Sequence, residues 1–143
     1  MISLLRIVLD TSILISALRS SGGAAGRILE LILAREIIAC MDLRLAFEYR
    51  EIAMRPEHLA ASYLGRIQIE QLLARVEDAA ESIEVVERHR PLSPDPADDM
   101  VLDVAINGRV DAIVTNNLRH LAAPGKRFGV AVLTPSEFLR MLV

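Results

Sequence analysis

Short apolar runs alternate with longer amphipathic segments along the whole chain. The runs have the length and the β-branched content of buried strands, and the segments between them carry apolar residues at helical spacing. The predicted strands are residues 4–9, 36–41, 82–87, 112–115 and 130–133. Strands that are separated by helices pair in parallel through right-handed crossovers, with helices on both faces of the sheet. The pattern therefore predicts an α/β fold of three layers around a parallel sheet of about five strands.

Capping residues and helix breakers delimit the helices that are expected between these strands. The predicted helices are residues 13–18, 25–35, a segment after Asp42, 57–80, 100–107, 118–121 and 136–142. Asp42 has the side chain of an N-cap, and Gly65 is expected to divide the segment 57–80 into a short and a long helix. Gly108 is expected to stop the helix before it, and Thr134, which a proline follows, to begin the last one.

The composition fits one globular domain. The 143 residues are 52% hydrophobic and 24% charged, which is enough to bury a core and keep a polar surface. No apolar stretch approaches the ~20 residues that span a bilayer, and Arg6 and Asp10 interrupt the segment where a signal peptide has its apolar region. The single cysteine, Cys40, cannot form an intramolecular disulfide. We therefore expect a cytoplasmic protein that is not inserted in a membrane.

The net charge leaves nucleic-acid binding open. At −3 it argues, taken alone, against a nucleic-acid-binding protein, because such proteins usually carry a basic face. Of the 16 basic residues, however, all but Lys126 are arginine, which suits bidentate contacts with phosphate. Two divalent cations in an acidic cluster would also make the total charge positive. The charge therefore neither excludes nor establishes this function.

Polar side chains follow four of the predicted strands. They are Asp10 directly after the first strand, Glu48 in the helix after the second, Asp95, Asp98 and Asp99 after the third, and Asn116 and Asn117 after the fourth. Because the carboxyl ends of parallel strands meet at one edge of a sheet, we expect these side chains to share a crevice. Clustered carboxylates raise one another's pKa unless a cation compensates them. Oxygen ligands without His or Cys favour Mg²⁺ or Mn²⁺, ions that activate water and stabilise the charge of phosphodiester cleavage.

Four segments of the chain resemble the motifs of PIN-domain ribonucleases, in order and spacing and over nearly the whole length. They are VLDTSIL around Asp10, LAFEYREIAMRP around Glu48, DPADDMVLDVA around Asp98 and VDAIVTNN around Asn117. The similarity is especially close to the toxins of prokaryotic toxin–antitoxin pairs. It implies a single PIN-like domain over residues 1–143. It also implies an endoribonuclease in which Mg²⁺ or Mn²⁺ activates the water that cleaves RNA.

The resemblance implies roles for individual residues. Asp10, Glu48 and Asp98 match the metal-binding acids of the family, with Glu48 binding the ion or orienting water. Asp95 flanks the third motif as a candidate accessory ligand, and Asn117 positions water or substrate. The residues with supporting roles are Thr11 and Ser12 beside the first acid, Asp99 as a further accessory ligand, and Thr115 and Asn116 at the fourth motif.

The fourth motif departs from the family pattern, because Asn117 stands where an acid is common. An amide oxygen coordinates or orients a ligand but adds no charge. A one-metal site, or a second ion held mainly by RNA phosphate, is therefore expected. The same departure supports an alternative function, a catalytically weakened PIN-like module that binds a protein or RNA partner without hydrolysis.

Two other families with an acid after the first strand fit the chain less well. Phosphotransferases of the haloacid-dehalogenase type need a second acid two residues after the first, and Ser12 occupies that place. Receiver domains need a lysine late in the sheet, whereas Lys126 precedes the last predicted strand. The ribonuclease resemblance is therefore the better account of Asp10.

The resemblance also implies two protein partners, a second copy of the chain in a homodimer and a small antitoxin protein that enters the acidic cleft. With aromatic residues at 3%, RNA recognition is expected to rest on backbone contacts and RNA shape. His58, His89 and His120 have no metal-ligand spacing and are expected at the surface. Asp103 is either simply exposed or close enough to reach the cleft, and the sequence does not distinguish the two.

Overall fold

The computed structural model describes residues 4–88 and 95–142, which form a five-stranded sheet and eight helices. The strands are β1 (Arg6–Leu9), β2 (Ile38–Met41), β3 (Glu81–Ser82), β4 (Ala112–Val114) and β5 (Ala131–Leu133). The helices are α1 (Thr11–Arg19), α2 (Ala24–Leu33), α3 (Leu43–Ala53), α4 (Pro56–Ala61), α5 (Arg66–Ala79), α6 (Pro96–Gly108), α7 (Leu118–Arg127) and α8 (Pro135–Met141). All strand pairs are parallel, and the order is β3-β2-β1-β4-β5. The predicted α/β fold with a parallel sheet is confirmed.

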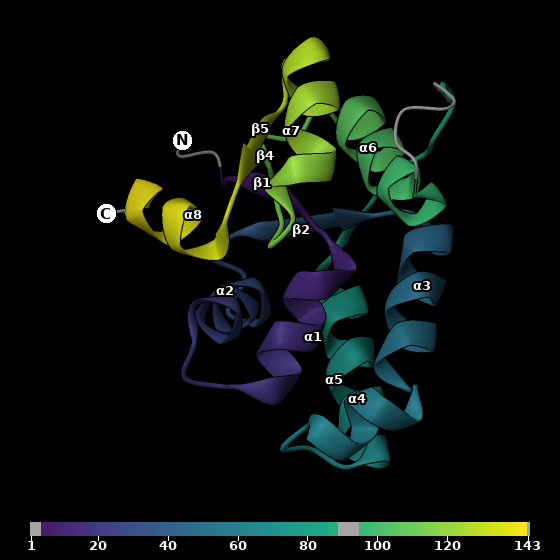
Figure 1. Cartoon of the computed structure of the whole chain (residues 1–143), viewed down its shortest axis with the longest axis vertical. Helices are drawn as coiled ribbons and strands as arrows, with labels where there is room; N and C mark the ends of the chain where they lie inside the picture. Colours follow the sequence, from purple (N-terminus) through teal and green to yellow (C-terminus); the bar gives the residue numbers. More distant parts are fainter. Residues whose placement is uncertain (1–3, 89–94, 143) are drawn as a thin grey trace.

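Helices enclose the sheet on both sides (Figure 1). α1, α2 and α5 lie together on one face, where α8 packs against α2, and α6 and α7 cover the other face. α3 and α4 lie beside α1, and α3 also contacts α6. The chain moves outward from β1 to β3 and returns to β4 on the other side of β1. β1 and β4 therefore flank the switch point at which open α/β sheets bind ligands beyond the carboxyl ends of their strands.

The hydrophobic core surrounds the two central strands. Ile7 and Val8 of β1 and Ile113 of β4 are fully buried, and Ile28 and Leu102 bury side chains from helices on opposite faces. Full burial of one such side chain contributes about 1.5–3 kcal/mol to stability. Among the described residues, none of the helices combines the length and the hydropathy that a bilayer crossing requires.

The signals at helix ends agree with the structure. Asp42 is the N-cap of α3, and its carboxylate accepts a hydrogen bond of 2.9 Å from the backbone N–H of Leu45. Thr134 and Glu137 form a reciprocal capping box at the start of α8, each side chain accepting from the other's backbone N–H. α5 begins directly after Gly65, at the predicted break. These caps pair N–H groups that a helix cannot satisfy by itself, and so they determine where the helices start.

β3 is shorter than predicted, with two residues in place of the range 82–87. The Ile83 N–H still bonds to a carbonyl of β2, but the N–H groups of Val86 and Glu87 both donate to Oδ1 of Asn107, each at 3.0 Å. The side chain of Asn107 in α6 therefore accepts hydrogen bonds from N–H groups that would otherwise pair with a neighbouring strand. The prediction of a strand over residues 82–87 rests on their β-branched side chains, which carry no information about this competing acceptor.

The end of α6 agrees with the prediction in its position, and the glycine there has a different role from a left-handed cap. The helix does end at Gly108, but the residue in the left-handed conformation is Arg109, with φ of 49°. Gly108 packs closely instead, because a Cβ at this position would lie 3.1 Å from Cδ1 of Ile83, a tight contact. The glycine therefore marks a contact between α6 and the segment after β3.

α7 is longer than predicted. It extends to Arg127 rather than ending at Leu121, and it contains Pro124. The proline lacks an N–H, but its carbonyl accepts a hydrogen bond from the backbone of Phe128, so the helical path continues past it. Residues 89–94, which include His89, lie outside the described residues.

Candidate functional site

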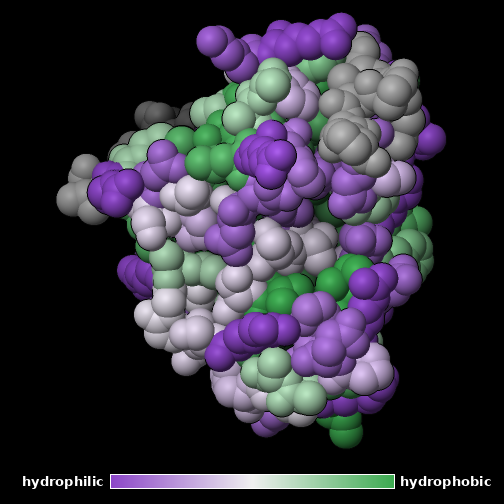
Figure 2. All heavy atoms as spheres, viewed as in Figure 1, coloured by the Kyte–Doolittle hydropathy of each residue, from purple (hydrophilic) through white to green (hydrophobic). Residues whose placement is uncertain are grey.

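A polar cleft of about 500 Å³ lies beyond the carboxyl ends of β1 and β4. Its walls are α1, the middle of α3, the start of α4 and the start of α6, and Figure 1 shows the start of α6 above the start of α3. The lining residues that the sequence singled out are Asp10, Thr11, Ser12, Glu48, Asp95, Asp98, Asn116 and Asn117. Figure 2 shows the molecule from the same direction as Figure 1. Hydrophilic residues cover much of this face, and hydrophobic residues are exposed between the positions of α1 and α3. The fold therefore brings all four motifs to one place.

Asp10 is held at the junction of β1 and α1. Its backbone N–H donates to the Val114 carbonyl of β4 at 2.9 Å. Its Oδ2 accepts hydrogen bonds from the hydroxyls of Ser12, at 3.0 Å, and Thr115, at 2.7 Å. Within residues 4–88 and 95–142 no group donates to Oδ1. One carboxylate oxygen is thus fixed by hydroxyls, and the other is available for a ligand.

Thr115 connects the first motif to the fourth. It is fully buried, and its hydroxyl oxygen accepts a hydrogen bond of 2.9 Å from the backbone N–H of Asn117 while it donates to Asp10. Beside it, the side chain of Asn116 donates to the Ser16 hydroxyl at 2.9 Å. Thr11 lines the same cleft at the first position of α1. The loop after β4 is therefore bonded both to Asp10 and to the side of α1.

α3 is anchored to β1 by the residue next to Glu48. The hydroxyl of Tyr49 donates a hydrogen bond of 2.6 Å to the Leu9 carbonyl, one residue before Asp10. Complete burial raises the pKa of Tyr49 well above its ordinary value, so the hydroxyl stays protonated and donates. This contact fixes the distance between the helix that carries Glu48 and the end of the strand that Asp10 follows.

Glu48 lies in an environment that disfavours its charge. Partial burial raises the pKa of Glu48 above the ordinary value, the negative charges of Glu51 and Asp95 raise it further, and Arg55 opposes them. Asp95, the N-cap of α6, accepts a hydrogen bond from the Ala97 N–H at 2.9 Å. A cation near Glu48 and Asp95 would relieve this repulsion.

Asp98 and Asp99 lie in the first turn of α6, where the helix N-terminus favours negative charge. Asp98 lines the cleft although its exposed fraction is only 5%, whereas Asp99 is buried and does not line it. Nδ1 of His120 lies 3.4 Å from Oδ2 of Asp98 and 3.0 Å from Nδ2 of Asn117. His120, which the sequence placed only at the surface, therefore bridges two of the expected site residues.

Sequence reasoning missed four lining residues of interest. Ser16 and Arg19 continue the face of α1 that Ser12 begins, Ile52 follows Glu48 by one helical turn on α3, and His58 belongs to α4. The four-residue helical spacing from residue 12 to residue 16 and from 48 to 52 is the signal that would have found two of them. His58 has no such signal, because only the tertiary fold brings α4 beside the end of α1.

Asp103 does not reach the cleft. It is fully buried, and its Oδ2 lies 3.4 Å from Nη2 of Arg44, which also pairs with Asp42 at 2.9 Å. The two carboxylates raise the pKa of Arg44 against the effect of its partial burial. Asp103 therefore belongs to a structural ion pair between α6 and α3.

The cleft suits a hydrated divalent cation better than a bare one. Among the described residues, no three His, Cys, Asp or Glu side chains lie close enough together to hold a metal ion by themselves. Mg²⁺, however, keeps several of its waters and is usually held by one or two carboxylates together with substrate phosphates. The lining supplies carboxylate, hydroxyl and amide oxygens, including Oδ1 of Asp10. This donor chemistry fits Mg²⁺ or Mn²⁺.

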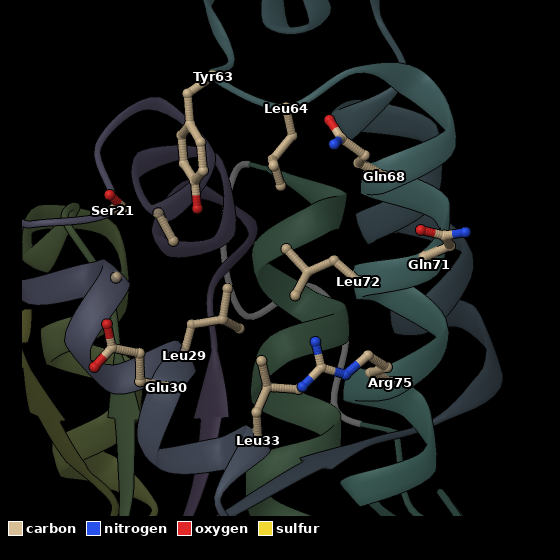
Figure 3. Close-up of a pocket in the computed structure, with 12 residues that line it drawn as sticks. Ser21, Leu29, Glu30, Leu33, Tyr63, Leu64, Gln68, Gln71, Leu72 and Arg75 are labelled. Carbon is tan, nitrogen blue, oxygen red and sulfur yellow. The ribbon is translucent and has the colours of Figure 1, made fainter.

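A second pocket, of about 320 Å³, lies between α1, α2 and α5 (Figure 3). Leu29, Leu33 and Leu72 point toward one another at its base, Tyr63 covers one side, and Arg75 reaches in from α5. Among the described residues that line it, Glu30 supplies the one carboxylate. Its lining has no set of acids for metal chemistry, so the acidic cleft remains the candidate active site.

The fold and the cleft define a class of protein: a parallel α/β domain with carboxylates from three elements around one crevice at the switch point of the sheet. A family model described as PIN domain matches residues 6–119, which includes all four motifs, and the chain belongs to this family. A comparison with curated proteins gave no match. PIN domains are generally nucleases that act on RNA and typically use divalent metal ions.

Proposed function

We propose that this chain is an endoribonuclease that depends on Mg²⁺ or Mn²⁺. The observation that carries the proposal is the shared cleft: Asp10 after β1, Glu48 of α3 and Asp98 of α6 line one cavity. Partial burial and the charges of Glu51 and Asp95 raise the pKa of Glu48 in this cleft, and a bound cation would offset that repulsion. A cluster of acids in one cleft is typical of a catalytic metal site.

A divalent ion, when bound, would activate water and neutralise charge on the phosphate that is cleaved. Asp10 would hold the ion through Oδ1 while Ser12 and Thr115 keep the carboxylate in place. Asp98 would contribute the second charge. Glu48, whose pKa is raised by burial, would orient the attacking water and accept its proton.

Asn117 would act on water or substrate through its amide oxygen, because its Nδ2 already contacts His120. It supplies no charge, so we propose one ion held by the protein, with any second ion held mainly by RNA phosphate. Asp95 at the rim of the cleft would be an accessory ligand through solvent, since its Oδ1 already accepts from the backbone of α6.

We also propose that the protein is a cytoplasmic toxin of a toxin–antitoxin pair and forms a homodimer. The motif resemblance supports the biological role. The excess of carboxylates in the cleft suits an antitoxin that inserts a basic side chain. Exposed apolar side chains, such as Leu43, Phe47 and Ile67, support an interface with a second copy. Size-exclusion chromatography with light scattering would measure the mass of the assembly.

RNA cleavage tests the proposed function. A labelled single-stranded RNA is incubated with the protein in Mg²⁺, in Mn²⁺ or in EDTA, and the fragments are separated on a gel. We expect cleavage with either ion and none in EDTA, and we expect Asp10→Asn to reduce the rate by at least about 100-fold. Asp78→Asn, an exposed acid paired with Arg35 outside the cleft, is the matched control and should cleave normally. Undiminished cleavage by Asp10→Asn would contradict the proposal.

A further inference from the structure

We propose that Arg19, oriented by His58, binds a phosphate of the RNA strand that lies away from the phosphate being cleaved. This inference rests on the proposed ribonuclease function and deepens it by assigning the residue that holds the substrate. Both side chains line the same cleft as the carboxylates. They come from the last turn of α1 and from α4, at the opposite end of α1 from Asp10.

The lining of the cleft follows one side of α1. Thr11, Ser12, Ile15, Ser16 and Arg19 all face the cavity, with the spacing of a single helical face. Arg19 is nine positions after Asp10 in the chain, which corresponds to a rise of about 13 Å along the helix axis at 1.5 Å per residue. A phosphate that Arg19 contacts is therefore a different one from the phosphate at Asp10. The side chain of Arg19 therefore has a role in binding the RNA strand rather than in cleaving the phosphodiester bond.

Arg19 supplies positive charge to a cleft that otherwise repels RNA. Among the described residues that line this cavity, Asp10, Glu48, Asp95 and Asp98 supply carboxylates and Arg19 is the one arginine or lysine. Within the described parts of the chain, no carboxylate pairs with Arg19, in contrast to the exposed Arg27 and its partner Glu30. Its charge is therefore available to a polyanion.

His58 orients this guanidinium without neutralising it. Nη2 of Arg19 lies 3.2 Å from Nδ1 of His58. A guanidinium only donates, so Nδ1 must be the acceptor and the proton of the neutral imidazole is on Nε2. A carboxylate in the same place would hold the side chain equally well but cancel its charge. A guanidinium that keeps its charge and is held in one orientation suits bidentate contact with phosphate oxygens.

RNA binding without cleavage tests the role of Arg19. Fluorescence anisotropy of a labelled single-stranded RNA is measured with the Asp10→Asn protein at several salt concentrations. Adding Arg19→Ala should weaken binding roughly tenfold, as loss of one charged contact does, and should reduce the slope of log K against log salt by about 0.7. Arg19→Lys should recover part of the affinity. Arg27→Ala removes another exposed arginine, outside the cleft, and should leave both quantities unchanged.

The role of His58 needs a pair of variants. His58→Asn places an amide oxygen near the position of Nδ1 and should keep the affinity, whereas His58→Phe keeps a ring without an acceptor and should weaken binding. Equal affinities for these two variants would overturn the orienting role. In otherwise native protein, Arg19→Ala should raise KM for RNA more than it lowers kcat.

The outcomes separate this inference from the proposed function. RNA binding that is unchanged by Arg19→Ala, with the same salt slope, would overturn the inference while metal-dependent cleavage by the native protein still stands. A native protein that neither binds nor cleaves RNA would overturn both. A larger loss in kcat than in KM would also overturn the inference, because it would place Arg19 at the reacting phosphate.

Discussion

Replacing Thr115 by valine should destabilise the protein and release Asp10 from its fixed position. Thr115 is fully buried between β4 and the cleft. Its hydroxyl donates to Oδ2 of Asp10 at 2.7 Å and accepts from the Asn117 N–H at 2.9 Å. Valine has nearly the same shape but makes neither bond. The substitution therefore removes two hydrogen bonds with little change in packing.

The magnitude follows from those two bonds. The hydrogen bond from the Thr115 hydroxyl to the charged carboxylate of Asp10 contributes about 1.5–3 kcal/mol to stability. Leaving the N–H of Asn117 without its acceptor costs about 1 kcal/mol more. The extra buried methyl group offsets about 0.8 kcal/mol. We expect the free energy of unfolding to fall by about 2–3 kcal/mol, which corresponds to a decrease in Tm of roughly 6–10 °C for a domain of this size.

Urea denaturation followed by circular dichroism measures this change. Thr115→Ser is the matched control, because it keeps the hydroxyl and loses only a methyl group, at a cost of about 1 kcal/mol. The valine variant should be the less stable of the two. A valine variant as stable as the serine variant would refute the reasoning, since it would mean that the hydroxyl does not hold Asp10.

Three further predictions concern other parts of the fold. Gly26→Ala should lower stability by about 1–3 kcal/mol, because its Cβ would lie 2.5 Å from the carbonyl oxygen of Ser21; Gly22→Ala, with open space around it, is the control in the same denaturation assay. Burial raises the pKa of Cys40 to about 12, so a thiol reagent should react with it only after unfolding, and rapid labelling of native protein would contradict this. The capping hydrogen bonds lower the pKa of Glu137, so its contribution to stability should be lost as the pH falls below 4.5 through the lowered value, and Glu137→Gln should show a smaller loss over that range.

The sequence predicted those features of the site that depend on neighbours along the chain. Asp10 stands out because an apolar run ends at it, and Asp42 because its side chain suits a helix start. The spacing of strands and helices then placed the other acids at the same edge of the sheet. These features need only periodicity and the rule that parallel strands end together.

Features that depend on distant side chains were missed. Arg19 and His58 are 39 residues apart, and no spacing in the sequence connects them. Asn107 shortens β3 by accepting from the backbone of residues 86 and 87, a competition that strand propensity does not contain. His120 reaches Asp98 because α7 packs beside α6. In each case the decisive partner is supplied by tertiary packing rather than by the local sequence.

Binding of Mn²⁺ tests the central claim, that carboxylates of one cleft hold a divalent ion, most directly. Electron paramagnetic resonance measures free Mn²⁺ during titration of the native protein, Asp10→Asn and the control Asp78→Asn. We predict binding by the native and control proteins and much weaker binding by Asp10→Asn. Equal binding by all three proteins, or none by the native protein, would contradict the claim.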